Sequence, residues 1–212
     1  MIVTDAVHDY LRASRHSPDA LLSEMEEQGA REGIPIVVPE TGQLLQVLAL
    51  ACQARRVLEV GTAIGVSTLY LARALPQDGK VISFEIDQPR HRAARAYLER
   101  AGVSDRTDLR LEDAREGLAK LSDEFDLAFI DGVKTQYGDY FEALLPRLRR
   151  GGVLVVDNVL MGGTVAEARS DGHWSAEQIE NARSFNACLL AHEELVATIT
   201  PVGDGVLVGV RR

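Results

Sequence analysis

Short apolar segments alternate with segments of helical periodicity through most of the chain, and this alternation constrains the fold more than any other feature. The apolar segments are almost uninterrupted, as in Phe125–Ile130 and Val153–Val156. Such strands are typical of a parallel sheet with helices on both faces, because neither face meets water. The sequence therefore predicts an α/β fold with a mostly parallel sheet.

The order of these segments predicts one domain over residues 1–212, in which residues 1–40 form an N-terminal helical extension. We expect strands over residues 56–60, 81–86, 108–111, 125–130 and 153–156, and helices over 67–75, 89–100 and 115–121. A further helix marked by Tyr140–Leu148 is expected to end at Gly151-Gly152, and a long one to begin at the capping box of Ser175 and Gln178.

The chain termini add two expectations of local structure. Ser17-Pro18 is a typical helix start, and Thr41 can cap the next helix. Near the C-terminus, Leu195–Val202 and Val206–Val210 flank Gly203-Asp204-Gly205, which is typical of a hairpin. The sheet is therefore expected to end with an antiparallel strand.

The bulk composition argues against several classes of protein. The formal net charge is −9, which disfavours a nucleic-acid binder. No segment has the apolar length of a membrane span, and the N-terminal residues do not resemble a signal peptide. Cys52 and Cys188 form no CxxC pair and lie among apolar residues, so buried thiols are expected. These features favour a soluble protein of the cytoplasm.

A glycine-containing turn follows the first strand, in Val57–Ser67. Gly61 and Gly65 allow the backbone to approach a ligand closely, although residue 63 is alanine, so the pattern is not GxGxxG. About twenty residues later, Glu85 ends the second strand, where an acid commonly accepts hydrogen bonds from ribose hydroxyls. The combination indicates a cofactor that contains adenosine.

Three polar residues end two other strands. Asp131 follows Phe125–Ile130, and Asp157 and Asn158 follow Val153–Val156. The carboxyl ends of neighbouring parallel strands converge where such sheets bind ligands. Two carboxylates and one amide oxygen suit Mg²⁺, with Ca²⁺ or Mn²⁺ as alternatives, and no nearby histidine or cysteine suggests zinc.

These motifs, in this order, resemble the cation-dependent O-methyltransferases that include catechol O-methyltransferase and caffeoyl-CoA O-methyltransferase. The similarity runs from about Ile34 to the C-terminus and includes Thr41–Leu45, Phe129–Lys134, Tyr137, Val156–Leu160 and Gly203–Gly205. The resemblance implies a Rossmann-like class I methyltransferase with a seven-stranded, mostly parallel sheet, a C-terminal antiparallel hairpin and N-terminal helices. It also implies S-adenosylmethionine as cofactor and a homodimer.

The resemblance assigns roles residue by residue. Asp131, Asp157 and Asn158 match the metal ligands, and Lys134 matches the catalytic lysine that takes the proton of the substrate hydroxyl. The residues that match cofactor-binding positions are Val37, Glu59, Gly61, Thr62, Gly65, Ser67, Glu85, Asp113, Ala114 and Asp131. Gly132-Val133 and Met161 depart from residues that are common in the family, and both departures fall near the expected substrate pocket.

The resulting hypothesis is a metal-dependent O-methyltransferase that acts on a small, catechol-like molecule. The metal would bind two adjacent substrate oxygens, and a neighbouring cation would favour the neutral, basic form of Lys134. Residues 160–174, with His173 and Trp174, are expected to form a mobile lid.

Three other functions compete with this hypothesis. One keeps the fold and methylates a modified tRNA base, which the acidic net charge disfavours. A second is a nicotinamide-dependent oxidoreductase, which the alanine at residue 63 and the C-terminal hairpin disfavour. The third is a catalytically silent small-molecule binder, which the presence of Asp131, Lys134, Asp157 and Asn158 disfavours.

Overall fold

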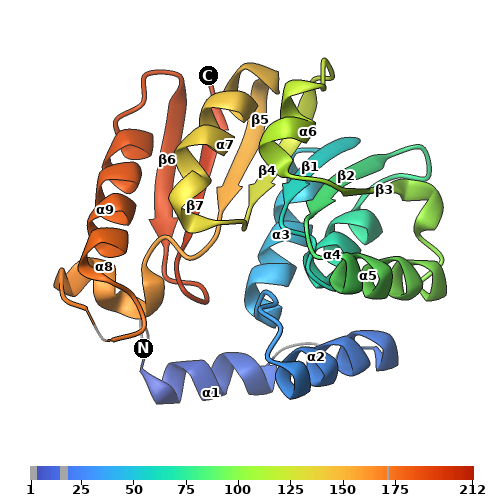
Figure 1. Cartoon of the computed structure of the whole chain (residues 1–212), viewed down its shortest axis with the longest axis horizontal. Coiled ribbons are helices and arrows are strands. Elements are labelled where there is room, and N and C mark those ends of the chain that lie inside the picture. The colour runs from blue at the N-terminus through green and yellow to red at the C-terminus, as the bar shows by residue number, and fades with distance from the viewer. Residues whose placement is uncertain (1–3, 15–18, 171) are drawn as a thin grey trace.

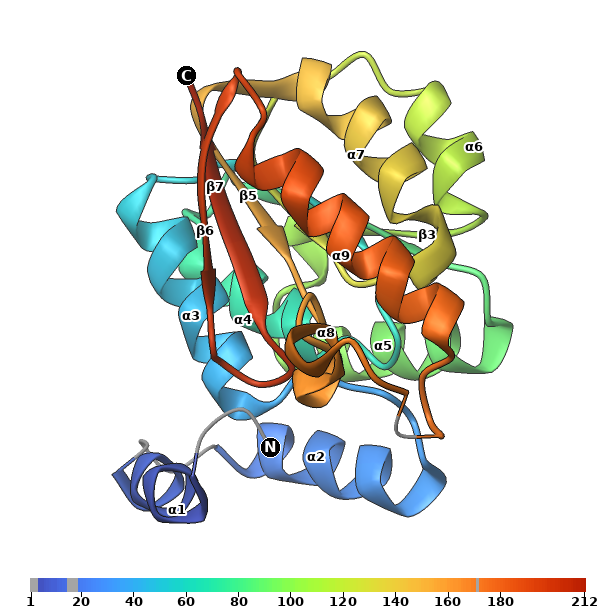
Figure 2. The same ribbon diagram turned by 90° about the vertical axis from the view of Figure 1, so that its left-hand side faces the viewer.

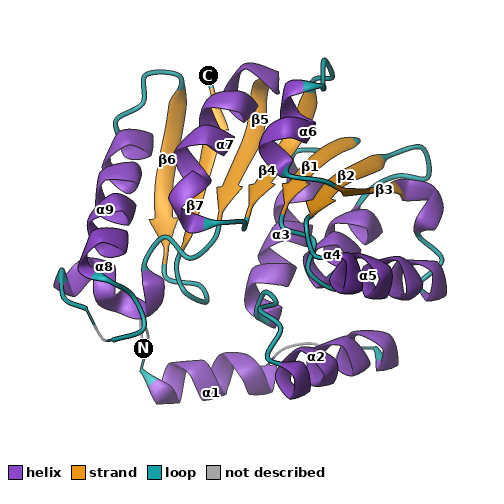
Figure 3. Ribbon diagram, viewed as in Figure 1, coloured by secondary structure: helices purple, strands orange, loops and turns teal. Residues whose placement is uncertain are grey.

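The computed structural model describes residues 4–14, 19–170 and 172–212. Its centre is a seven-stranded sheet in the order β3-β2-β1-β4-β5-β7-β6 (Figures 1 and 3). The first five strands in the chain are parallel to one another. They span Arg56–Val60 (β1), Lys80–Glu85 (β2), Thr107–Leu111 (β3), Phe125–Ile130 (β4) and Leu148–Val156 (β5).

The C-terminal hairpin forms as the sequence predicts. Its strands are Leu195–Thr200 (β6) and Val206–Arg211 (β7), and they pair antiparallel. β7 inserts between β6 and β5 and also runs antiparallel to β5. The expected class of fold, a mostly parallel sheet that ends with an antiparallel hairpin, is therefore confirmed.

Helices cover both faces of the sheet (Figure 2). On one face, Pro39–Ala51 (α3), Val66–Ala74 (α4) and Gln88–Arg100 (α5) pack over a core that includes Leu45, Leu69 and Leu98. On the other, Ala114–Ala119 (α6), Tyr137–Leu144 (α7) and Ala176–Leu190 (α9) pack over Phe125, Phe141 and Leu189. Burial on both faces explains why the strands are almost uninterrupted in apolar residues.

The N-terminal helices are Asp5–Ser14 (α1) and Ala20–Glu32 (α2). They lie beneath the edge of the sheet at which the parallel strands end (Figure 1). Leu22 and Met25 of α2 are buried in the same core as α3 and α4. The loop that joins α2 to α3 therefore runs along this edge.

Some local expectations are wrong. The cap of α2 is Asp19, whose carboxylate accepts a hydrogen bond from the backbone N–H of Leu22, whereas Ser17 and Pro18 lie outside the described residues. Thr41 does not cap α3, because the helix already begins at Pro39, which suits the first helical position.

Two further expectations are wrong, one about the start of β5 and one about the cysteines. Leu148 opens β5 instead of closing the preceding helix, because the chain enters the sheet before Gly151-Gly152, with a register shift against β4. Cys188 is exposed and Cys52 is only partly buried, so the expectation of buried thiols is wrong for both cysteines. Helical spacing alone does not show which face of α9 meets the core.

Candidate active site

A cavity of about 630 Å³ opens at the carboxyl ends of the parallel strands. Its walls come from the segments that follow β1, β2, β3, β4 and β5, from the loop before α3 and from the turn between β6 and β7. This position is where open α/β sheets bind ligands. The volume lies within the usual range of small-molecule sites, which is about 300–1,000 Å³.

The turn after β1 forms one part of the wall. A Cβ on Gly61 would lie 2.1 Å from the backbone oxygen of Asp131, so only glycine permits this close approach of β1 to β4. Ala63 adopts a left-handed conformation with φ +46°. Its backbone N–H donates a hydrogen bond to Glu85 at 2.8 Å, so the turn directly positions that carboxylate.

Glu85 ends β2 and lines the cavity. Its carboxylate also accepts hydrogen bonds from the backbone N–H groups of Ile86 and Asp87, both at 2.8 Å. Three backbone donors therefore hold the group in place, while the remaining acceptor capacity of its oxygens is available to a ligand. This arrangement suits recognition of ribose hydroxyls.

Asp113 and Ala114 line the same part of the cavity. Asp113 caps α6, with its carboxylate accepting a hydrogen bond from the backbone N–H of Arg115. The guanidinium of Arg115 also donates to this carboxylate, and these hydrogen bonds lower the pKa of Asp113. The carboxylate is thus already engaged, which leaves contacts to an adenine ring mainly to the backbone and to Ala114.

The other candidate cofactor residues lie behind the wall and do not line the cavity: Val37, Glu59, Thr62, Gly65 and Ser67. Glu59 is fully buried, and it accepts hydrogen bonds from the hydroxyl groups of Ser83 and Thr68. Burial raises the pKa of Glu59. Thr62 is also buried and shares a 2.5 Å hydrogen bond with Ser83. Glu59 and Thr62 therefore support β1 and its turn from the core side, and a direct contact of any of the five residues with a cofactor stays a prediction.

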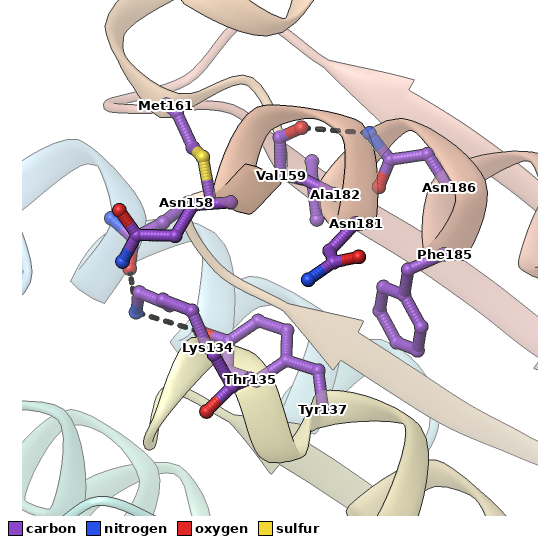
Figure 4. A pocket seen from close by; sticks show the side chains of 11 residues that line it. Lys134, Thr135, Tyr137, Asn158, Val159, Met161, Asn181, Ala182, Phe185 and Asn186 are labelled. Carbon is purple, nitrogen blue, oxygen red and sulfur yellow. Dashed lines mark hydrogen bonds between the residues drawn. The ribbon is translucent and has the colours of Figure 1, made fainter. Parts of the chain in front are cut away.

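The polar residues that end β4 and β5 come together at the opposite end of the cavity. The ammonium of Lys134 donates to Asp131 Oδ1 at 2.9 Å. It also donates to Asn158 Oδ1 at 2.5 Å (Figure 4). Two of the three candidate metal ligands thus aim oxygen atoms at one point, and a positive charge sits there. The donor set therefore fits a cation.

Asp157 completes this set from a buried position, with a relative exposure of 5 %. Burial, together with the charge of Asp131, raises the pKa of Asp157 to about 7. A buried and a partly buried carboxylate, beside the single ammonium of Lys134, are short of positive charge. Among the described residues, no group of three or more His, Cys, Asp or Glu side chains is placed to hold a metal ion. Any cation would therefore rely on two carboxylates and the amide of Asn158.

Tyr137 holds the lysine in place, a role that the sequence analysis did not assign. Its hydroxyl accepts a hydrogen bond from Lys134 at 2.7 Å and donates one to the backbone oxygen of Asp157 at 3.2 Å. Burial raises the pKa of Tyr137 well above its usual range, so the phenol stays neutral. The signal for this role in the sequence is that Tyr137 follows Lys134 by three residues, where α7 begins.

Asp204 is a second site residue that the sequence analysis missed, since it was interpreted only as part of a turn. It lines the cavity, and the side-chain amide of Asn158 donates to its carboxylate at 3.5 Å. The backbone oxygens of Asp204 and Gly205 accept hydrogen bonds from Leu160 and Val159. The hairpin turn is therefore bound to the segment that follows β5.

The segment between β5 and α9 forms the rim. Asn158 and Met161 have left-handed backbone conformations, with φ +60° and +45°. Such strain in non-glycine residues is concentrated at functional sites. His173 and Trp174 line the cavity mouth, and their rings meet edge to face at 4.8 Å between centroids.

Within the described parts of the chain, no helix is long and apolar enough to cross a membrane.

Comparisons with known proteins show which protein family the chain resembles. Residues 13–212 match the model of a protein family described as O-methyltransferase. A catechol O-methyltransferase of Niastella koreensis is 39 % identical over 191 residues, which cover 87 % of this chain and 84 % of that protein. A probable caffeoyl-CoA O-methyltransferase of Arabidopsis thaliana is 33 % identical over 177 residues, covering 80 % and 76 %.

Solved structures share the fold as well. The O-methyltransferase TomG of Streptomyces achromogenes, solved in complex with S-adenosylmethionine, has a TM-score of 0.84 and 32 % identity. The alignment covers 97 % of this chain and 96 % of that one. The Rossmann-like architecture and the resemblance to catechol and caffeoyl-CoA O-methyltransferases are thereby confirmed.

Proposed function

Because the chain belongs to the O-methyltransferase family, we propose that it transfers a methyl group from S-adenosylmethionine to a hydroxyl oxygen of a small aromatic molecule. The acceptor carries two adjacent hydroxyls, as in catechol, and the reaction requires a divalent cation, Mg²⁺ by preference. This assignment rests on the donor set at the ends of β4 and β5.

One observation carries the proposal. Lys134 lies within hydrogen-bond distance of both Asp131 and Asn158, at the end of a cavity whose other end is lined by Glu85. A base and a cation-binding oxygen set thus adjoin a site suited to a nucleoside. A nicotinamide-dependent oxidoreductase or a catalytically silent binder does not need a base and a cation site next to a nucleoside site.

The chain's own residues supply orientation and a proton acceptor. Glu85 accepts hydrogen bonds from the ribose and so fixes the cofactor along the cavity. Lys134 in its neutral form takes the proton of the reacting hydroxyl. Tyr137 keeps the amine directed at that point, and alignment of the two reactants contributes much of the rate enhancement.

The bound cation would be held by Asp131, Asp157 and Asn158. It would supply Lewis acidity that lowers the pKa of the acceptor hydroxyl. The raised pKa of Asp157 supports this assignment, because a second positive charge would relieve the repulsion between the two carboxylates.

A homodimer in the cytoplasm is the remaining part of the proposal. Exposed apolar side chains support self-association near the N-terminus: Tyr10 is 71 % exposed on α1, and Val47 and Leu50 are 60 % and 57 % exposed on α3. Exposed apolar patches commonly mark protein interfaces. Light scattering at several concentrations would show a mass of twice the chain, and a monomer throughout would contradict this part alone.

The test of the activity is a methyl-transfer screen with labelled S-adenosylmethionine over catechols, caffeoyl esters and tRNA. We expect catechol-type products that appear with added Mg²⁺ and disappear with a chelator. Methylated tRNA without catechol products would favour the modified-base alternative. Full catechol methylation in excess chelator would contradict the cation assignment.

A further inference from the structure

A second, smaller cavity lies beside Lys134, and neither the metal set nor the cofactor end accounts for it. This inner chamber has a volume of about 30 Å³ and lies between the turn at Lys134–Gln136, the segment after β5 and the helix α9 (Figure 4). That is room for one or two groups of the size of a water molecule. Lys134 and Asn158 line both the inner chamber and the large cavity.

Asn186 on α9 faces this inner chamber with an unsatisfied acceptor. Its relative exposure is 6 %, and its Nδ2 donates to the backbone oxygen of Val159 at 2.7 Å. Its Oδ1 accepts no hydrogen bond from any described residue. The opposite orientation of the amide would place two acceptor oxygens against each other, so Val159 fixes Oδ1 as the free atom.

The remaining walls restrict what can satisfy this oxygen. Phe185 and Ala182 contribute carbon surface, and the polar side chains of Thr135, Gln178 and Asn181 donate no hydrogen bond to Oδ1. The ammonium of Lys134 is already directed at Asp131 and Asn158. A buried acceptor without a donor is costly, so it selects a small neutral group that carries a proton. A hydroxyl or an amino group fits the volume, whereas a carboxylate or a ring does not.

We propose that the inner chamber is an acceptor subsite. In it, Asn186 Oδ1 binds a hydroxyl or amino substituent on the ring carbon adjacent to the carbon that bears the reacting hydroxyl. The proposal rests on the function proposed above. Lys134 contacts the reacting hydroxyl in that function, so a substituent one carbon further along the ring reaches the inner chamber on the other side of the lysine. The acceptor class thereby narrows to catechols with a third, adjacent hydrogen-bond donor.

The test compares two acceptors of equal size, 1,2,3-trihydroxybenzene and 3-methylcatechol, with catechol as reference. For the wild type we expect kcat/KM to favour the hydroxyl over the methyl substituent by about tenfold, which is the value of one buried neutral hydrogen bond. In Asn186→Leu the ratio should fall to about one. Binding titrations with S-adenosylhomocysteine and Mg²⁺ present should show the same change in Kd.

Ser184→Ala is the control on the same helix, because Ser184 of α9 is exposed and is not among the residues that line the chamber. It should retain the wild-type ratio. If Asn186→Leu does not fold, Ala182→Leu addresses the same chamber by filling it, and both 3-substituted acceptors should then lose at least about tenfold relative to catechol.

The outcomes separate this inference from the function on which it rests. If the wild type methylates catechol but shows equal kcat/KM for the two substituted acceptors, the inner chamber holds solvent only and the subsite is overturned. An unchanged ratio in Asn186→Leu, or an unchanged preference in Ala182→Leu, overturns it as well. If no catechol is bound or methylated at all, the proposed function itself fails.

Discussion

At the β2 end of the large cavity, the carboxylate of Glu85, which we propose to bind the ribose, is held by three backbone N–H donors. At the β4–β5 end, side chains interact with one another: Asp131 and Asn158 accept hydrogen bonds from the ammonium of Lys134, and burial together with the charge of Asp131 raises the pKa of Asp157. At the β2 end the protein itself holds the carboxylate in place without a ligand, whereas the carboxylates at the β4–β5 end are short of positive charge. We infer that the fold preorganises cofactor binding and leaves the acceptor end dependent on a cation.

The largest expected effect comes from removing a buried charge at the acceptor end. Asp157→Ala should lower metal-dependent turnover by at least about 10⁴-fold, since Lewis-acid stabilisation is typically worth several kcal/mol. Binding of S-adenosylmethionine, measured by calorimetry, should stay close to the wild-type value. Equal weakening of cofactor binding would mean that the two ends are not independent.

The next effect separates the base from the metal ligands. Lys134→Ala should lower kcat by ~10²–10⁴-fold. Raising the pH should partly restore the rate, because the acceptor then ionises without a base. Binding of Mg²⁺ should be retained or become tighter, as the ammonium no longer contacts Asp131 and Asn158. Full kcat of this variant at neutral pH would show that Lys134 is not the base.

At the cofactor end, Glu85→Ala should weaken S-adenosylmethionine binding by roughly 10- to 100-fold, the value of hydrogen bonds to a charged acceptor. Glu112→Ala is the matched control: Glu112 lines the same cavity but forms an ion pair with Lys120. A dissociation constant that is the same in both variants and the wild type would remove Glu85 from the cofactor site.

The smallest effect concerns stability and pH. The folded pKa of Asp157 lies above its ordinary value of 3.8, so the folded state binds more protons than the unfolded chain between the two values. The contribution of Asp157 to the free energy of unfolding therefore decreases as the pH rises from about 4 to about 7.

Asp157→Asn should consequently stabilise the metal-free protein at pH 8 by at least ~1 kcal/mol, or about 2–4 °C in Tm, and have little effect at pH 4. Thermal melting in chelator at both pH values would measure the difference. A variant that is less stable than the wild type at pH 8 would contradict the strained-pair interpretation.

Much of the fold was predictable, because burial on both faces makes a strand such as β4 apolar throughout. The start of β5 at Leu148 was not, since an apolar residue before a glycine pair suits a helix end as well as a strand start. The convergence of Asp131, Asp157 and Asn158 also followed from strand order alone.

The remainder of the site depends on side-chain direction, which the sequence does not reveal. Glu59 and Thr62 lie in the same motif as Gly61, yet their side chains turn into the core instead of the cavity. Asp204 belongs to a turn in sequence and to the site in space. The inner chamber needs Asn186 of α9 to meet Lys134, two residues that no local pattern connects.

The ammonium of Lys134 also affects how the protein exists before any metal arrives. As an internal counter-ion for Asp131, it neutralises part of the site from within the chain, close to the point at which a divalent ion would bind. If the proposed cation binds here, this internal counter-ion should reduce the amount by which folding depends on metal supply, because part of the negative charge is already balanced when the metal-free chain folds.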